Sequence, residues 1–175
     1  GCAQIICSDK TGTLTQNKMT VVEHTGSQER LLATAMALCS DAELDGSHNA
    51  VGEPTECALV NYAWALDLDK NKLKEQYPRI GEAPFDSMRK RMSTVHRCPD
   101  GSILQFSKGA PDEMLKRCTT ALVDGKCVPM SDTLRAEILR ENKSMADKAL
   151  RVLCAAQRVW QSPPADWEPD TLEQD

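Results

Sequence analysis

The chain has 175 residues and a net charge of −5, with 41% hydrophobic and 27% charged residues. This length allows one domain with a sizeable core, and the acidic balance disfavours a nucleic-acid-binding protein, which would present basic patches. The longest apolar stretch, about 31–39, is far shorter than the ~20 residues of a membrane-spanning helix. The 8 cysteines are scattered without zinc-type spacing, so we expect buried free thiols in a reducing compartment.

Apolar periodicity and start signals predict several helices. Ser27 is placed to cap the first, Pro54 opens the second at its first turn, and Ser131 caps a long helix with Leu134, Ile138, Leu139 and Met145 inward. In chain order the expected helices cover about 28–39, 54–66, 68–77, 111–118 and 131–150. The polar stretch 40–52 between the first two is expected to be a loop.

Short β-rich runs and turn signals predict the strands. Pro99-Asp100-Gly101 and Asp124-Gly125 are expected to form hairpin turns. The expected strands are 3–7, 18–24, 79–85, 91–96, 103–108, 121–123, 126–130 and 151–160. Hairpins with segregated helices indicate an α+β fold, a mostly antiparallel twisted sheet flanked by helices. From Gln161 the chain is rich in proline and acidic residues, which predicts a mobile tail.

One stretch near the start carries the clearest chemistry. The apolar run 3–7 leads to Asp9, which is expected just past the carboxyl end of the strand, where ligands bind in open α/β sheets. Gly12 permits a sharp turn, and the threonines and Lys10 supply hydroxyls and a positive charge. A carboxylate among such donors is suited to attack phosphorus. The alternative is a Thr/Gly-rich turn in which Asp9 caps a helix.

The seven residues Asp9-Lys10-Thr11-Gly12-Thr13-Leu14-Thr15 resemble the phosphorylation signature of P-type ATPases, ion pumps that pass through an aspartyl-phosphate. The resemblance implies that Asp9 accepts the γ-phosphoryl group of ATP and that Thr13 contacts it. It also implies that the Asp9 carboxylate and the Thr11 carbonyl help to hold Mg²⁺. Asp9, Lys10, Thr11 and Thr13 are therefore the catalytic candidates.

Further stretches are ambiguous when each is taken alone. Residues 52–56 fit an ordinary helix start whose acids complement the dipole, 84–92 fit a core Phe beside a solvated basic turn, and 107–111 fit a strand-to-helix turn. Each also fits a nucleotide site, through base stacking on Phe85 or anion binding at a helix start. Taken in order with 149–153, they resemble the nucleotide-binding domain of P-type ATPases.

That resemblance implies a role for each adenine-pocket residue. Phe85 would stack on adenine, and Glu56 would accept a hydrogen bond from the adenine amino group. Lys108 would line the floor of the pocket, and Gly109 would leave room for the base.

The outer part of the implied site consists of cations and supporting groups. Lys90 and Arg151 would meet phosphate or ribose oxygens, and Leu153 would pack on the edge of the base. The candidate set is completed by Glu53, Thr55 and Arg89.

The whole protein implied by this resemblance is a P-type cation-transporting ATPase, of which this would be a cytoplasmic portion of an integral membrane protein. Its expected division is a phosphorylation-domain stub at 1–19, a nucleotide-binding domain at 20–160 and a linker at 161–175. The expected partners are ATP and the remaining phosphorylation, actuator and transmembrane domains. The Thr-Gly-Asp and Gly-Asp-Gly motifs of the family do not follow Leu153. We therefore expect the chain alone to be a monomer that binds nucleotide without turnover, with residues 1 to about 15 mobile or packed in a non-native way.

The stretches 108–118 and 142–152 look most like bacterial calcium-pump relatives, with sodium, proton and magnesium pumps as alternatives. A different class of enzyme, a haloacid-dehalogenase-type phosphatase, shares an aspartate loop. Such phosphatases usually carry a second Asp two residues after the nucleophile, where this chain has Thr11. A non-catalytic interaction module is a third possibility.

Overall fold

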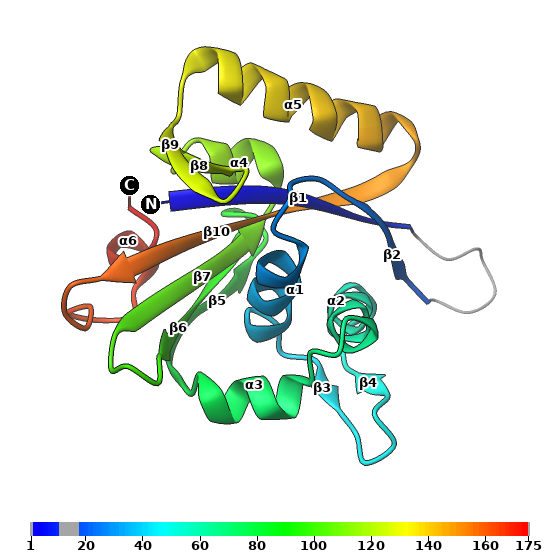
Figure 1. Ribbon diagram of the computed structural model, residues 1–175, viewed down its shortest axis with the longest axis vertical. Coiled ribbons are helices and arrows are strands. Elements are labelled where there is room, and N and C mark those ends of the chain that lie inside the picture. The colour runs from blue at the N-terminus through cyan, green and yellow to red at the C-terminus, as the bar shows by residue number, and fades with distance from the viewer. Residues whose placement is uncertain (1, 11–17, 175) are drawn as a thin grey trace.

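A six-stranded antiparallel sheet forms the centre of the part that the computed structural model describes, which is the backbone of residues 2–10 and 18–174 and the side chains of 18–174. Its strand order is β2-β1-β10-β7-β6-β5 (Figure 1). The strands are β1 (Cys2–Lys10), β2 (Thr20–His24), β5 (Arg79–Asp86), β6 (Arg91–Arg97), β7 (Ile103–Gly109) and β10 (Leu150–Trp160). The α+β prediction is confirmed.

Helices α1 (Glu29–Leu38), α2 (Pro54–Ala65) and α3 (Lys70–Gln76) lie on one face of this sheet. Side chains at helical spacing on α1 pack against inward residues of the strands, which gives the main apolar core. Its members include Leu32, Met36, Leu59, Leu73, Met92 and Phe106. We call the side of β6 and β7 that bears Met92, His96, Phe106 and Lys108 the helix-covered face. The expected loop 40–52 contains a small hairpin, β3 (Glu43–Leu44) and β4 (Ala50–Val51).

The remaining elements pack near β1 and β10. The Asp124-Gly125 turn joins β8 (Thr120–Val123) to β9 (Lys126–Pro129), as predicted. Helix α4 (Pro111–Leu115) ends earlier than expected, and α5 (Asp132–Asp147) begins with the Ser131 hydroxyl accepting from the Leu134 amide at 3.0 Å. Of the apolar α5 side chains expected to be inward, Met145 is buried but Leu139 is exposed, so α5 covers the sheet through its last turns.

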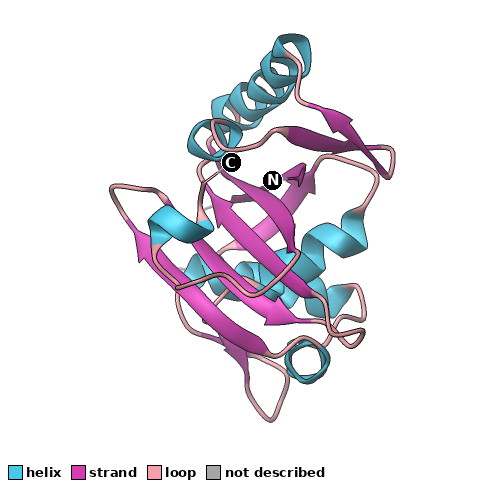
Figure 2. Ribbon diagram, turned by 90° about the vertical axis from the view of Figure 1, so that its left-hand side faces the viewer, coloured by secondary structure: helices cyan, strands magenta, loops and turns pink. Residues whose placement is uncertain are grey.

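The segment 161–174 is packed against the sheet, which corrects the prediction of a mobile tail. Its helix α6 (Pro169–Leu172) lies in front of the strands in Figure 2. Leu172 is buried among Ala83, Val95 and Ile103 on the side of the sheet opposite α1. We call this side, which also bears Arg91, Ser93 and Gln105, the segment-covered face. Charge and proline content suggested disorder, but one buried Leu and a buried Glu173 anchor the segment.

Strand β1 is longer than expected. It runs from Cys2 to Lys10, so Asp9 lies within the strand and not just past its end. Asp9 is in register with Arg151 of β10 on one side and Val21 of β2 on the other. This pairing on both edges extends the strand beyond its apolar run, because backbone hydrogen bonds do not require apolar side chains. Thr11 and Thr13 lie outside the described residues.

The cysteine prediction holds in part. Cys39, Cys118 and Cys154 are buried free thiols, and burial raises the pKa of Cys39 and of Cys154. Cys127 is instead disulfide-bonded, and it lies on the exposed strand β9, where it is not shielded as the buried thiols are. Across the described ranges, no helix combines the length and apolar character needed to cross a bilayer.

Candidate functional site

A cavity of about 740 Å³ lies where the start of α2, the end of β7, the start of β10 and the turn between β5 and β6 meet. Nine of the ten predicted nucleotide-binding residues line it: Glu53, Thr55, Glu56, Phe85, Lys90, Lys108, Gly109, Arg151 and Leu153. These residues come from four stretches that are far apart in the chain. Antiparallel pairing of β5, β6, β7 and β10 brings three of them together, and α2 supplies the fourth by packing on the same sheet. The other lining residues are Asp41, Ala42, Gly52, Met92, Ala110 and Val152.

The floor of the cavity is an ion pair between Lys108 and Glu56, whose Nζ and Oε1 atoms are 2.6 Å apart. Lys108 is 7% exposed and also donates to the Ser40 hydroxyl at 2.8 Å. The other oxygen of Glu56 accepts from the amides of Asp41 and Ala42 at 2.8 and 3.1 Å. A carboxylate has about four acceptor positions, so Glu56 retains capacity for one further donor.

Lys70 supports this floor from beneath. Its ammonium donates to the carbonyl of Ser40 at 2.7 Å and to that of Ala42. Burial lowers the pKa of Lys70 to about 8, with the Glu43 carboxylate opposing that shift. Because Lys70 fixes the carbonyls of the same short loop whose amides meet Glu56, it sets the position of the Glu56 carboxylate.

The start of α2 forms one wall. Pro54 occupies the first turn, and the Glu53 carboxylate caps the helix by accepting from the Glu56 amide at 3.1 Å. Arg151 donates to the Thr55 hydroxyl at 2.8 Å, which joins β10 to the start of α2. Glu53 and Thr55 therefore shape the wall and orient Arg151.

The opposite wall is the turn 86–91, with Phe85 at its entry. Phe85 is 62% exposed, so one face of its ring is open at the rim of the cavity. The Asp86 carboxylate accepts from the amides of Arg89 and Met88, both at 2.8 Å, and these bonds lower the pKa of Asp86. Lys90 has φ +54, a left-handed conformation that costs about 1 kcal/mol for a residue with a side chain.

Gly109 lies against this turn. A Cβ on Gly109 would lie 2.6 Å from Arg91 Cβ and 2.8 Å from Arg91 Cα, and would also collide with the Lys90 carbonyl oxygen. The absence of a side chain lets β7 approach the turn so closely that the Ala110 amide donates to the Lys90 carbonyl at 3.0 Å. Residue 109 must therefore be glycine, because a side chain there would collide with the backbone of the turn 86–91.

Arg89 is the predicted nucleotide-binding residue that does not line the cavity. Its guanidinium donates to both oxygens of Glu173 at 2.6 Å and to the Pro84 carbonyl. Among the catalytic candidates, Asp9 and Lys10 are described as backbone within β1, and Thr11 and Thr13 fall outside the described residues. The residues with described side chains contain no group of three or more His, Cys, Asp or Glu that could hold a metal ion. Mg²⁺ binding by Asp9 and Thr11 stays a prediction.

Sequence reasoning missed the loop 40–42 and its support, Lys70. Little in the sequence indicated that Lys70 would be buried, because a lysine at the start of a helix is ordinarily exposed to solvent. Gly52 and Ala110 lie within stretches that the sequence had marked, and Met92 follows from the alternation of β6.

Comparisons with known proteins identify the family to which the chain is similar. Residues 28–175 match the family described as P-type ATPase, cytoplasmic domain N. The chain is 39% identical over 169 residues to calcium-transporting ATPase 1 of Lactococcus lactis, an alignment that covers 89% of this chain and 19% of that protein. It is 41% identical to calcium-transporting ATPase 1 of Bacillus cereus, over 95% of this chain and 20% of that protein. It is 36% identical to human plasma membrane calcium-transporting ATPase 3, over 97% of this chain and 16% of that protein.

The chain thus spans about a fifth of the length of its bacterial relatives. The predicted likeness to bacterial calcium-pump relatives is confirmed. With the family match covering 28–175 and relatives near 40% identity over most of the chain, the chain belongs to the cytoplasmic N-domain family of P-type ATPases.

Proposed function

We propose that the chain is the ATP-binding domain of a P-type cation-transporting ATPase whose transported ion is calcium. The observation that carries this proposal is the cavity of about 740 Å³, which joins an exposed aromatic rim, a buried ion pair and two exposed cations. Its volume falls within the range of ~300–1,000 Å³ typical of small-molecule sites.

The inner end of the cavity suits a purine base. Phe85 offers an open ring face for stacking. Glu56 has a remaining acceptor position for the adenine amino group, and Lys108 donates toward the same region. A guanine carbonyl would meet the Glu56 carboxylate at that position, so the site should prefer ATP over GTP.

The outer end suits the phosphates. Lys90 and Arg151 are exposed cations that line the cavity, whereas Lys108 is buried at its floor. This order places fixed positive charge toward solvent, where a flexible triphosphate can reach it. No P-loop motif is present in the sequence, so phosphate binding would depend on these side chains.

In the whole pump, we propose that ATP bound here phosphorylates Asp9, with Lys10, Thr11 and Thr13 around the phosphoryl group and Mg²⁺ held partly by Asp9 and Thr11. Residues 1–19 would then belong to the phosphorylation domain, 20–160 to the nucleotide-binding domain and 161–175 to a linker. The isolated chain is a monomer that binds nucleotide without turnover. No observation favours a phosphatase.

Calorimetric titration of ATP into the chain tests this proposal, with GTP as the competing nucleotide. Phe85→Ala should weaken ATP binding by ~1–3 kcal/mol, because the base loses its stacking partner. Met88→Ala is the matched control, since Met88 lies on the same turn, is 88% exposed and does not line the cavity. Absence of binding at millimolar ATP, or equal binding by Phe85→Ala and the native chain, would refute the proposal.

A further inference from the structure

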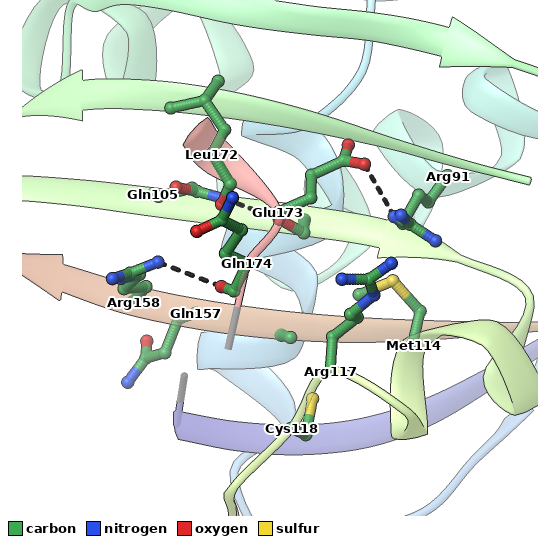
Figure 3. Close-up of a pocket in the computed structure, with 12 residues that line it drawn as sticks. Arg91, Gln105, Met114, Arg117, Cys118, Gln157, Arg158, Leu172, Glu173 and Gln174 are labelled. Atoms are coloured by element: carbon green, nitrogen blue, oxygen red, sulfur yellow. Dashed lines mark hydrogen bonds and ion pairs between the residues drawn. The ribbon is translucent and has the colours of Figure 1, made fainter. Parts of the chain in front are cut away.

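Glu173 is a buried carboxylate that joins the 161–174 segment to the cavity turn. Its side chain is 3% exposed and accepts from Arg89 Nη1 and Arg91 Nε, each at 2.6 Å. It also accepts from the Ser93 hydroxyl at 3.1 Å. Figure 3 shows Glu173 directed toward Arg91 from the segment. A carboxylate this buried, with three donors from one short stretch of chain, holds that stretch in a fixed place.

The stretch that it holds also forms a wall of the cavity. Arg89 and Arg91 flank Lys90, which lines the cavity from the opposite side of the backbone. The Lys90 carbonyl accepts from Ala110, and its amide donates to Asp86 at 2.7 Å. The left-handed backbone conformation of Lys90 is therefore held by the bonds of its own amide and carbonyl. The ion pairs of the adjacent residues Arg89 and Arg91 hold it as well.

Glu173 is itself fixed to the sheet. Gln105 donates to the Leu172 carbonyl at 2.8 Å, and Arg158 donates to the Gln174 carbonyl at 3.0 Å (Figure 3). Leu172 is buried beside Val95. With a hydrogen bond on each side of it, Glu173 acts as a rigid support for the turn and cannot swing freely.

We propose that Glu173 is a positioning residue for nucleotide binding: through Arg89 and Arg91 it holds the turn that presents Lys90 and Phe85. This inference rests on the proposed ATP-binding function. It has a reciprocal consequence, because a coupling between two sites acts equally in both directions. Bound ATP should strengthen the docking of residues 171–174, and loss of that docking should weaken ATP binding.

Glu173→Gln tests the inference, since it keeps the shape of the side chain and removes its charge. We expect the Kd for ATP to rise about 10-fold, within the usual range of coupling between sites. The Kd for adenosine, which stacks on Phe85 but has no phosphate for Lys90, should rise less than the Kd for ATP. Glu173→Asp, which restores the charge, should recover part of the ATP affinity.

Met145→Ala is the matched control. Met145 is 2% exposed on α5 and lines neither the cavity nor the space beneath the 161–174 segment. The change should lower stability without changing either Kd. Equal ATP affinity in Glu173→Gln and the native chain would overturn the inference, as would an equal loss of affinity in Met145→Ala.

Two readouts separate this inference from the proposed function. In the nucleotide-free chain, amide chemical shifts of Arg89, Lys90 and Ala110 should move in Glu173→Gln and stay in place in Met145→Ala. Unmoved shifts would overturn the support role even where ATP binds normally. In the native chain, ATP should slow hydrogen exchange at residues 171–173, and unchanged exchange at saturating ATP would contradict the coupling. If the native chain binds no ATP, the proposed function fails and the inference fails with it.

Discussion

The two faces of the central sheet use the same strands for opposite purposes. On the helix-covered face, β6 and β7 present Met92 and Lys108 to a cavity of about 740 Å³. On the segment-covered face, the alternate residues Ser93, Gln105 and Ser107 are hydrogen-bonded to one another or to the 161–174 segment, beside a space of about 40 Å³. The helix-covered face has a cavity large enough for a ligand, whereas the polar groups of the segment-covered face are hydrogen-bonded within the protein.

This difference shows how an open site can be kept rigid. The turn 86–91 carries residues of both faces, so the closed network behind it fixes what the open cavity presents in front. A polar network that is fully satisfied specifies one arrangement, because any departure leaves buried groups unpaired. The segment-covered face is therefore the structural support of the helix-covered face.

The largest effect is expected where both faces meet, at Gly109. In Gly109→Ala the new Cβ would lie 2.8 Å from Arg91 Cα, a backbone atom that cannot move aside. We expect a loss of about 3 kcal/mol in the free energy of unfolding, with weaker ATP binding from the displaced turn. Urea unfolding measures this. Gly46→Ala is the control, since nothing lies within 4 Å of a Cβ there, and an equal effect of the two changes would contradict the account.

Acid should destabilise the helix-covered face through His96. Burial lowers the pKa of His96 from 6.5 to about 4. Its Nδ1–H donates to the Tyr77 carbonyl, and its Nε2 accepts from the Thr94 hydroxyl. Between pH 6.5 and about 4, His96 binds a proton in the unfolded chain but stays neutral in the folded chain. The contribution of neutral His96 to the free energy of unfolding is therefore complete above pH 6.5 and is lost as the pH falls toward 4.

The size of this loss is about 3 kcal/mol, at 1.36 kcal/mol per pKa unit. Urea unfolding at intervals from pH 7.5 to about 4 would measure it. His96→Gln should flatten the slope of stability against pH between 6.5 and 4. An unchanged slope in that variant would assign the acid sensitivity to other groups.

A smaller effect is expected at Trp167, which holds the 161–174 segment on Gly81. Trp167 is 37% exposed, so Trp167→Ala should cost about 2 kcal/mol, less than a fully buried aromatic. Thermal unfolding would measure this loss. A Cβ on Gly81 would lie 2.5 Å from Trp167 Cε2, so Gly81→Ala should destabilise the native chain.

The two changes should be coupled. In the Trp167→Ala background, Gly81→Ala should cost far less, because the colliding ring is gone. Additive effects would mean that the segment does not pack on Gly81 in solution.

Much of the fold could be predicted because local signals agreed with the tertiary arrangement. Pro54, Ser131 and Asp124-Gly125 each mark a boundary that the structure confirms. The site stretches were ambiguous individually, and they were found through their resemblance, taken in order, to the nucleotide-binding domain of P-type ATPases. Their approach to one another could not be read from spacing, since it depends on strand pairing across about 50 residues.

Other features depend on partners far away in the chain. Glu173 in an acidic, proline-rich stretch looks solvated, and its burial follows from Arg89 and Arg91, more than 80 residues away. Asp9 lies within β1 because β10 pairs with it, a contact that no local pattern encodes. Arg89 is basic like its neighbour Lys90, but the turn 86–91 directs Arg89 to Glu173 and Lys90 to the cavity.

Amide chemical shifts during a titration of ATP into the isotope-labelled chain would test the central claim most directly. The account predicts shifts clustered at Glu56, Lys90, Gly109 and Arg151, stronger with ATP than with GTP and lost in Phe85→Ala. Shifts confined to Gln105, Ser107 and the segment-covered face, or no shifts at millimolar ATP, would contradict it.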